Sequence, residues 1–453
     1  MPLNPRTTFF AITLFVAGVC GTISSGYAGT ATAAETEVQP ALQSLPLPSG
    51  EEMTFEVFSP QRPQGDLVQG TAPNLRVLWI APSFGINSRH RQAAERLAER
   101  GAEVWLIDLA DSLFLTRSAQ TLRDIPGSLV ADIIDALSTS VEPPIPLVVV
   151  SNSYGAIPTL RGIHSWQQRR QTLDQARPAG LIGSILFSPS FLTRVPPLGQ
   201  PAEFIAELPA TNSPLYIFQA ANNSSRGQLP AAQQQLQHAT LYVEILKDVM
   251  SAFYDKDTSA ISQQRFNQVP DMILRASKQL AQHAMPQTAL PLAASAKATI
   301  RSGLDTQLKA YSGQIKPEPI ALNDANGKPF TVADYRGRVT IINFWASWCR
   351  PCVKEIPSLN RLKQAMQGKP FRLISINFAE SAMDINNFLK LVDVDFPVLL
   401  DLDGRVAGQW NVFAFPSTFV IGPDGQIHFG VNAGIHWDTP EVMQQIQQLL
   451  PTP

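Results

Sequence analysis

The spacing of apolar residues separates the chain into two regions of regular structure. From residue 51 to residue 285, near-continuous apolar runs alternate with segments in which apolar residues recur at helical spacing. The runs lie at Leu75 to Ala81, Val104 to Leu109, Pro146 to Val150, Leu181 to Ser188, Leu215 to Ala220 and Leu241 to Leu246. Such runs are typical of buried parallel strands, and the segments Arg89 to Arg100 and Leu129 to Leu137 predict covering helices. We therefore expect an α/β fold with a mostly parallel sheet.

The stretch between residues 286 and 312 breaks this rhythm. It is rich in Ala, Ser and Thr, shows no strand pattern, and is interpreted as a linker over residues 286–313. Its second half, from Ala296 to Tyr311, could form a helix packed on either neighbour. The pattern thus predicts one domain at 51–285 and another at 314–453, which suits a chain of 453 residues.

The N-terminus has the features of an export signal. A basic residue precedes an apolar run from Phe9 to Val19, which is short for a membrane span. Ala31-Thr32-Ala33 fits the small-residue cleavage rule, and Gly26-Tyr27-Ala28 is a second candidate. We expect residues 1–34 to be a signal peptide, residues 35–50 an extended lead-in, and the mature protein to be periplasmic or otherwise exported. An uncleaved membrane anchor is the open alternative.

The composition is that of a folded, soluble protein. Hydrophobic residues make up 44% of the chain and charged residues 16%, and the formal net charge is -2. This balance provides no attraction to nucleic acid or to acidic membranes. We therefore expect no nucleic-acid partner. We also expect no bound cofactor and no stable membrane span after signal cleavage.

The distribution of cysteines indicates redox chemistry. Cys20 lies within the predicted signal peptide, which leaves Cys349 and Cys352 as a single C-x-x-C pair. A disulfide framework would scatter cysteines in even numbers, whereas one close pair favours a redox-active dithiol or half of a zinc site. Zinc needs further ligands, and neither His428 nor His436 forms a spaced pair with another cysteine. We therefore expect no metal site.

The order of residues around the pair assigns a role to each sulfur. The segment Val339 to Val353 reads as a buried strand, a short turn, and then Cys-Arg-Pro-Cys in the first turn of a helix. Unpaired amides and the helix dipole stabilise a thiolate at a helix N-terminus, so Cys349 is predicted to be the attacking sulfur. Cys352 follows one turn later and can resolve a mixed disulfide, while Pro351 fixes the turn between them.

Three further motifs accompany the dithiol. The segment Pro319 to Gly337 contains Asn326-Gly327, which favours a tight hairpin turn. Glu355-Ile356-Pro357 continues the dithiol helix, and Phe415-Pro416-Ser417-Thr418-Phe419 follows later in the chain. Together with the dithiol segment and its tryptophans, these motifs resemble the TlpA-like thiol-disulfide oxidoreductases of the thioredoxin superfamily over most of the C-terminal third.

This resemblance implies a thioredoxin fold and an enzyme that exchanges disulfides, by family analogy a reductase of protein disulfides. It places Pro416 at the family's cis-proline, which faces the disulfide. Its partners would be protein thiol or disulfide clients and an upstream redox partner. A peroxiredoxin is disfavoured, because that chemistry needs a Thr near an isolated cysteine and here Ala346-Ser347-Trp348 precede Cys349.

One departure from ordinary thioredoxin concerns the buried acid. Asn343 stands six residues before Cys349, where thioredoxin has an Asp, and an amide cannot accept a proton. The resemblance assigns that role to Glu355, one turn beyond Cys352, as the base for the resolving thiol. A solvated residue in the first turn of the helix is the alternative for Glu355.

The first region contains a motif similar to the nucleophile elbow of α/β-hydrolases. A strand ending at Val150 runs into Ser151-Asn152-Ser153-Tyr154-Gly155-Ala156, with Ser151 in place of the first glycine of G-x-S-x-G. Ser153 aligns with the nucleophile and the Tyr154 amide with an oxyanion donor. Pro82 to Gly85 would form the second oxyanion loop.

The residues that such a serine needs are not evident. Asn222 and Asn223 stand where an acid is expected, and the segment Lys247 to Asp255 contains no His. The other imidazoles are badly placed for a catalytic base: His90, His164, His238 and His283. We therefore expect a degenerate hydrolase-like domain that binds a client or serves as scaffold. A serine hydrolase with an accessory thioredoxin-like domain is the alternative function.

Overall fold

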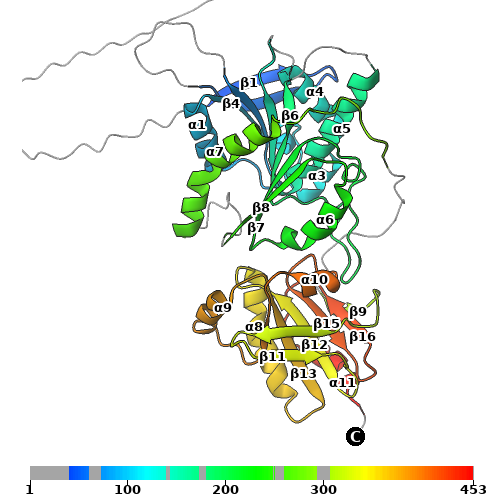
Figure 1. The fold of residues 1–453 in the computed structure, drawn as a ribbon. Coiled ribbons are helices and arrows are strands. Elements are labelled where there is room, and N and C mark those ends of the chain that lie inside the picture. The colour runs from blue at the N-terminus through cyan, green and yellow to red at the C-terminus, as the bar shows by residue number, and fades with distance from the viewer. Residues whose placement is uncertain are drawn as a thin grey trace, which may run out of the picture. The chain divides into compact units, whose positions relative to one another are not determined.

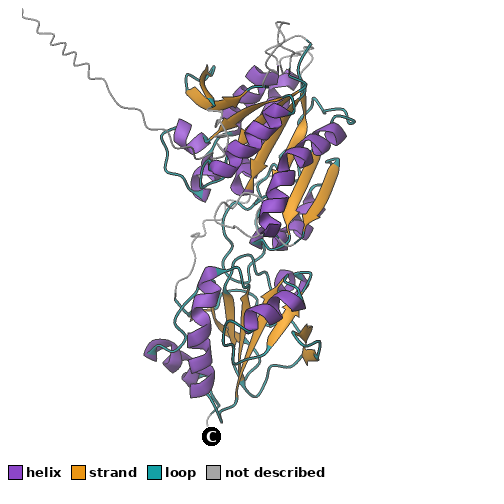
Figure 2. Cartoon of the chain, turned by 90° about the vertical axis from the view of Figure 1, so that its left-hand side faces the viewer, coloured by secondary structure: helices purple, strands orange, loops and turns teal. Residues whose placement is uncertain are grey.

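The computed structural model describes residues 40–60, 73–138, 143–172, 180–247, 249, 260–292 and 307–451. These residues form two eight-stranded sheets, and helices cover both faces of each (Figures 1 and 2). The predicted signal peptide, residues 1–34, lies outside the described residues.

The first sheet is mostly parallel, as the apolar runs predicted. Its strand order is β1-β2-β4-β3-β5-β6-β7-β8, in which the β1-β2 hairpin is antiparallel and also pairs antiparallel with β4. The strands are β1 (Ala41–Pro46), β2 (Glu52–Phe58), β3 (Leu75–Ile80), β4 (Ala102–Ile107), β5 (Leu147–Asn152), β6 (Leu181–Phe187), β7 (Leu215–Ala220) and β8 (Leu241–Leu246). The end of the predicted lead-in therefore contributes the edge strand β1.

The central strands of this sheet are buried on both faces, because an apolar cluster covers each face. Along β3, Val77 and Trp79 belong to the cluster under α1 and α7, whereas Leu78 and Ile80 belong to the cluster under α4 and α5. The helical elements are α1 (Ser88–Glu99), α2 (Leu109–Ser112), α3 (Ala119–Asp124), α4 (Gly127–Ser138), η1 (Ser153–Gly155), α5 (Ala156–Thr172), η2 (Ser224–Gln228), α6 (Leu229–Gln235) and α7 (Ala260–Leu280).

The second sheet has the thioredoxin arrangement. Its order is β11-β10-β14-β13-β12-β15-β16-β9, in which β12, β13 and β14 are parallel, β15 pairs antiparallel with β12, and β16 pairs antiparallel with β15. The strands are β9 (Lys309–Ala310), β10 (Ile320–Asp324), β11 (Pro329–Val332), β12 (Val339–Trp345), β13 (Phe371–Phe378), β14 (Val398–Asp401), β15 (Ser417–Ile421) and β16 (Ile427–Val431). The helices are α8 (Arg350–Ala365), α9 (Ala382–Leu389), α10 (Arg405–Gln409) and α11 (Pro440–Gln448).

The hairpin turn predicted at Asn326-Gly327 is confirmed. It joins β10 to β11, and Gly327 has a φ of 82°, which a residue with a side chain adopts at a cost. The Asp324 carboxylate accepts hydrogen bonds from the backbone amides of Asn326 and Lys328, both at 2.9 Å. The turn is therefore fixed by both glycine and an Asx contact.

The predicted linker is ordered where the structure describes it. Lys309–Ala310 pairs with β16, so the prediction of no strand before residue 312, and of a helix reaching Tyr311, is wrong at these residues. The Tyr311 ring packs edge-on against Phe419 at 5.7 Å, and such long-range contacts leave no local pattern in a sequence. Residues 293–306 lie outside the described residues, and the boundaries 51–285 and 314–453 stay predictions.

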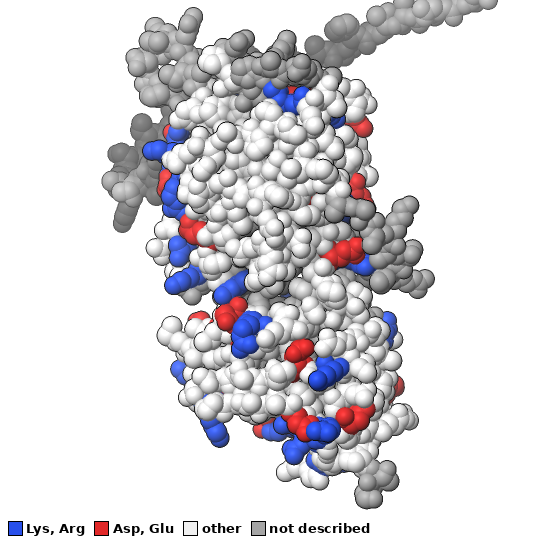
Figure 3. All heavy atoms as spheres, turned by 45° about the vertical axis from the view of Figure 1, so that its right-hand side comes forward, with Lys and Arg blue, Asp and Glu red and all other residues white. Residues whose placement is uncertain are grey.

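Charged side chains of both signs lie on the face of the molecule that Figure 3 draws. In Figure 3, basic and acidic side chains are interspersed, without a large area of one sign. None of the helices that the structure describes is long and apolar enough to span a lipid bilayer. Within the same residues, no group of three or more His, Cys, Asp or Glu side chains could hold a metal ion.

Candidate redox site

The central strand β12 delivers the dithiol to the start of α8. All seven residues of β12 are buried, and Ala346 to Trp348 then lead to Cys349, which is the N-cap of α8. Cys349 and Cys352 form a disulfide with their Cα atoms 5.3 Å apart. The strand, turn and helix predicted around the C-x-x-C motif are therefore confirmed.

The helix start provides hydrogen bonding for the first sulfur. The Cys352 backbone N–H donates to Cys349 Sγ at 3.3 Å, at the N-terminus of a 16-residue helix. An amide donor and the helix dipole both favour the thiolate form of this sulfur after reduction. Cys349 is 6% exposed and Cys352 1%, so the first sulfur is the more accessible one.

The segment around Pro416 lies next to the turn that carries the dithiol. The Phe415–Pro416 peptide bond is cis, as the resemblance implied. The Phe415 ring packs edge-on against Trp348 with centroids 6.0 Å apart. A second loop approaches the same turn, because a Cβ placed on Gly434 would lie 3.1 Å from the Pro351 carbonyl oxygen.

Glu355 carries a buried carboxyl group on the dithiol helix α8. It is 3% exposed and lies one turn beyond Cys352 on α8. Its Oε1 accepts a hydrogen bond from Asn343 Nδ2 at 2.8 Å, and its Oε2 accepts from Trp437 Nε1 at 3.2 Å and from the Ile435 amide at 3.4 Å. Burial raises the pKa of Glu355 to about 7, although the three donors oppose that shift.

Asn343 connects this carboxyl group to the sheet. It lies on β12 directly across from Thr418 on β15, and its Nδ2 donates to both Glu355 Oε1 and Thr418 Oγ1. The amide is a hydrogen-bond donor here, which an ionised Asp could not be. Asn343 therefore fixes the carboxyl group of Glu355, and the solvated alternative for Glu355 does not fit its burial.

Comparisons with known proteins agree with this geometry. Residues 313–429 match the AhpC/TSA family. The thiol-disulfide oxidoreductase ResA of Bacillus subtilis is 36% identical over 106 residues, which are 23% of this chain and 59% of that protein. ResA of Geobacillus kaustophilus is 30% identical over 139 residues, which are 30% of this chain and 79% of that protein. The chain belongs to the ResA family of thiol-disulfide oxidoreductases.

The ResA-family match is confined to the C-terminal part of the chain. The chain spans about 59 to 61% of the length of the first curated ResA relatives it matches. Among solved structures, StoA from Bacillus subtilis is 22% identical, with coverage of 29% of this chain and 96% of that chain and a TM-score of 0.25.

Two contributors to the ResA-family site were missed by sequence reasoning. Trp437 and Glu380 follow β16 and β13, far from the C-x-x-C motif along the chain. Glu380 accepts hydrogen bonds from Ser347, two residues before Cys349. A carboxylate directly after a buried strand was the one available signal for Glu380, because such positions cluster at the carboxyl edge of a parallel sheet.

The predicted elbow in the first sheet has the expected local shape. Ser153 follows β5 with a φ of 51°, a strained value for a residue other than glycine, and α5 begins at Ala156. A Cβ on Gly155 would lie 3.3 Å from the carbonyl oxygens of Ile80 and Ala81, so small size is required there. The Tyr154 ring lies under the Arg123 guanidinium, 4.6 Å away.

Three of the four histidines of the first region, His90, His164 and His283, have contacts away from Ser153. His164 Nε2 contacts the Leu290 carbonyl oxygen at 2.8 Å, and His283 Nε2 contacts the Tyr242 hydroxyl at 2.7 Å. His90 contacts Asn87, and burial lowers its pKa to about 3, which makes it a poor base at neutral pH. These contacts give no support to a catalytic triad.

The candidate acid positions of the elbow are used in local structure. The Asn223 side chain caps η2 by accepting from the Ser225 amide at 3.0 Å, and the Asn222 amide donates to the Val249 carbonyl oxygen. Most of the predicted loop Lys247 to Asp255 lies outside the described residues.

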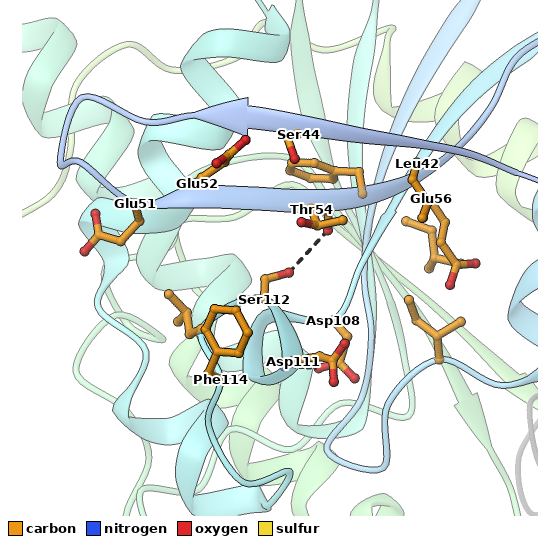
Figure 4. A pocket seen from close by; sticks show the side chains of 14 residues that line it. Leu42, Ser44, Glu51, Glu52, Thr54, Glu56, Asp108, Asp111, Ser112 and Phe114 are labelled. Carbon is orange, nitrogen blue, oxygen red and sulfur yellow. Dashed lines mark hydrogen bonds between the residues drawn. The ribbon is translucent and has the colours of Figure 1, made fainter. Parts of the chain in front are cut away.

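A pocket of about 570 Å³ lies between the β1-β2 hairpin and α2 (Figure 4). Its lining combines acidic side chains, among them Glu51, Glu56 and Asp111, with apolar ones. The Ser112 hydroxyl donates to the Thr54 carbonyl oxygen beside it. Arg117 pairs with Asp108 at 2.6 Å and with Asp111 at 3.2 Å. The lining contains neither the elbow serine nor a cysteine, so this pocket is separate from both candidate sites.

Proposed function

We propose that this protein exchanges disulfides with protein substrates, with Cys349 as nucleophile and Cys352 as resolving thiol. The observation that carries the proposal is the Cys352 amide donating to Cys349 Sγ at the start of α8, in a ResA-family domain. The Cys352 amide lies at the start of α8, where such an amide can also donate to the thiolate once the disulfide is opened. The direction of exchange, reduction of a client, is proposed by analogy with the TlpA-like family.

In one catalytic cycle the two thiols of the enzyme are oxidised and the client disulfide is reduced. The Cys349 thiolate attacks one sulfur of a client disulfide, forms a mixed disulfide and releases the first client thiolate. The Cys352 thiolate then attacks Cys349 Sγ, forms the intramolecular disulfide and releases the second client thiolate. Two electrons pass to the client, and an upstream dithiol must return them.

Glu355 is proposed as the base that accepts the proton of Cys352. The two residues lie at i and i+3 on α8 and therefore share a face of the helix. A carboxyl group with a pKa near 7 is partly ionised at neutral pH and takes a thiol proton at little cost. Asn343 and Trp437 hold the carboxylate in one orientation.

Pro416 is proposed to position the client at the dithiol. The Phe415 contact with Trp348 places this segment beside the active-site turn. The TlpA-like resemblance assigns the cis-proline to the wall that faces the disulfide. An extended client would then lie against it while its own sulfur meets Cys349.

The setting of this activity is also a proposal. The sequence of residues 1–34 supports export to the periplasm or beyond, where protein disulfides occur as clients. The first domain is proposed to be hydrolase-like because of the strand, strained serine and helix at Ser153. Its contribution would be to bind or present a client.

Trapping with Cys352→Ser tests the proposed cycle. A variant that cannot resolve its mixed disulfides should accumulate client adducts that are cleaved by dithiothreitol on gels of exported protein. The matched control is Cys349→Ser with Cys352→Ser, which should form none. Equal adducts in both variants, or none in either, would contradict the assignment of Cys349 as nucleophile.

A further inference from the structure

The turn that carries the nucleophile has little regular structure of its own. Ala346 to Trp348 connect the end of β12 to the N-cap of α8, and within this turn the Cys349 amide donates to the Ala346 carbonyl oxygen at 3.1 Å. Ser347 is half-buried at its centre. The position of Cys349 therefore depends on what holds Ser347.

Glu380 holds Ser347 from the neighbouring strand. Its Oε2 accepts the Ser347 backbone amide at 2.7 Å, and its Oε1 accepts the Ser347 hydroxyl. The Asn377 side-chain amide donates to the same Oε2 at 2.7 Å. Glu380 thus ties the loop after β13 to the turn after β12, two parallel strands that are paired in the sheet.

The environment of Glu380 makes this connection rigid. The side chain is only 5% exposed, so water competes little for its oxygens. The loop on its own side is fixed, since the Ala379 amide donates to the Asp401 carbonyl oxygen at 2.9 Å and Ala379 has a φ of 59°. Hydrogen bonds to a carboxylate are among the stronger ones in proteins.

Two opposing influences act on the ionisation of this carboxyl group. Burial raises the pKa of Glu380, and Asp384 on the same side adds to that shift. The donors from Ser347 and Asn377 lower it again, because they favour the charged form. The geometry holds for either form, since both oxygens keep lone pairs for the donors.

We propose that Glu380 is a positioning residue for the redox centre, which holds Ser347 so that Cys349 Sγ stays at the start of α8. This inference rests on the proposed function only for the role of Cys349. Glu380 acts through the backbone of the turn. It is assigned no contact with a client.

Removal of the side chain and removal of its charge have different consequences. Glu380→Ala frees Ser347, so the sulfur moves away from the amide that stabilises its thiolate, and the pKa of Cys349 should rise. Glu380→Gln keeps an isosteric side chain that can still accept the Ser347 amide and donate to its hydroxyl. The Gln variant also removes a negative charge, which by itself lowers the pKa of a nearby thiol.

The experiment compares these variants in the full chain with Cys20→Ser and Cys352→Ser, which leave Cys349 as the one remaining cysteine. The pH dependence of iodoacetamide alkylation gives the midpoint of thiolate formation. We expect Glu380→Ala to react roughly three- to tenfold more slowly at pH 7 than Glu380→Gln, with a higher midpoint. Asp384→Asn is the matched control, an exposed carboxylate close by that bonds Ser381 instead of the turn, and it should leave the rate unchanged.

Ser347→Ala provides a second variant if Glu380→Ala does not fold. It removes the hydroxyl contact and keeps the backbone one, so a smaller change in the same direction is expected. Equal midpoints for the Ala and Gln variants, together with an unchanged Ser347→Ala, would overturn the inference. A parent midpoint at or above that of free cysteine would instead contradict the proposed function, so the two failures are distinguishable.

Discussion

Glu355 is deeply buried, and the pKa of its carboxyl group lies near neutral pH. Its carboxyl group has one amide, one indole and one backbone donor, which restrict it to a single orientation. Burial still dominates and raises its pKa to about 7. A group with this pKa changes charge within the pH range in which thiol exchange is measured.

The first prediction concerns the pH dependence of the resolving step. The rate at which a Cys349 mixed disulfide is resolved should rise through about pH 7 as Glu355 ionises. Glu355→Gln should remove this rise and slow resolution at pH 8 by roughly 10- to 100-fold, because the base is lost. Stopped-flow release of a chromogenic client thiol measures the step. The control variant is Glu441→Gln, which changes an exposed carboxylate. If Glu355→Gln kept the same pH profile as wild type, Glu355 would have no part in the resolving step.

The same ionisation predicts a change in stability. The pKa of Glu355 is about 7 in the folded protein, against 4.5 for a glutamate side chain surrounded by water, so folding favours the protonated form. The resulting stabilisation is fully present below about pH 4.5 and is lost as the pH rises through about 7. From pH 5 to pH 8, oxidised wild type should lose about 2 to 3 kcal/mol relative to Glu355→Gln. Calorimetry at both pH values checks this, and a constant difference between the two proteins would contradict it.

Residues of the site differ in how far the sequence could predict them. Cys349, Cys352, Glu355 and Asn343 lie within one short strand-turn-helix segment, so spacing alone brings them together. Glu380 and Trp437 contact that segment across 33 and 82 residues of sequence. Only the sheet register and the tertiary packing bring them close, and neither is visible in a single sequence.

At the scale of elements, the apolar runs predicted the strands β3 to β8. β7 and β8 match their predicted runs, β3 and β6 differ from theirs by one residue at one end, and β4 and β5 differ by one or two residues at both ends. The edge strands β1 and β9 were not predicted. Both are exposed and stabilised by pairing with a partner, so they lack the apolar continuity that identified the others.

Close packing between two helices provides a prediction at this scale. A Cβ on Gly162 of α5 would lie 2.4 Å from Val130 Cγ1 of α4. Replacing glycine by alanine inside a helix usually stabilises by about 1 kcal/mol, but overpacking costs about 1–3 kcal/mol. We expect Gly162→Ala to lower the free energy of unfolding by roughly 1–2 kcal/mol in urea denaturation.

The control for this prediction is Gly408→Ala in α10, where a Cβ would meet nothing within 4 Å. It should be neutral or slightly stabilising. A more stable Gly162→Ala protein would mean that α4 and α5 are farther apart than the structure shows.

At the scale of the whole molecule, the chain carries two candidate sites with unequal support. The Cys349–Cys352 pair forms a disulfide, has the buried carboxyl group of Glu355 one helical turn away, and lies in the part of the chain that matches the ResA family. Ser153 has the strained turn, but His164 and His283 are bonded elsewhere. A serine without its base loses most of its catalytic power.

Substitution of the serine separates the two functions. Ser153→Ala should leave disulfide exchange unchanged, and wild type should hydrolyse short nitrophenyl esters no faster than this variant. Parallel assays of insulin reduction and ester hydrolysis on the full chain measure both. Ester turnover that disappears with Ser153→Ala would support the serine hydrolase alternative. Cys349→Ser is the complementary control, because it should abolish only the reduction.

The start of α8 has a counterpart in the start of α5. In both places a buried strand is followed by a residue with a nucleophilic side-chain atom, Ser153 directly after β5 and Cys349 four residues after the end of β12, and an α-helix begins within three residues of it. A thiol at the start of a helix can lose its proton without a separate base, whereas a serine hydroxyl needs a base. The same order of strand, turn and helix therefore suits the proposed disulfide exchange at Cys349 but gives the hydroxyl of Ser153 no reactivity of its own, because the two residues differ in carrying sulfur or oxygen.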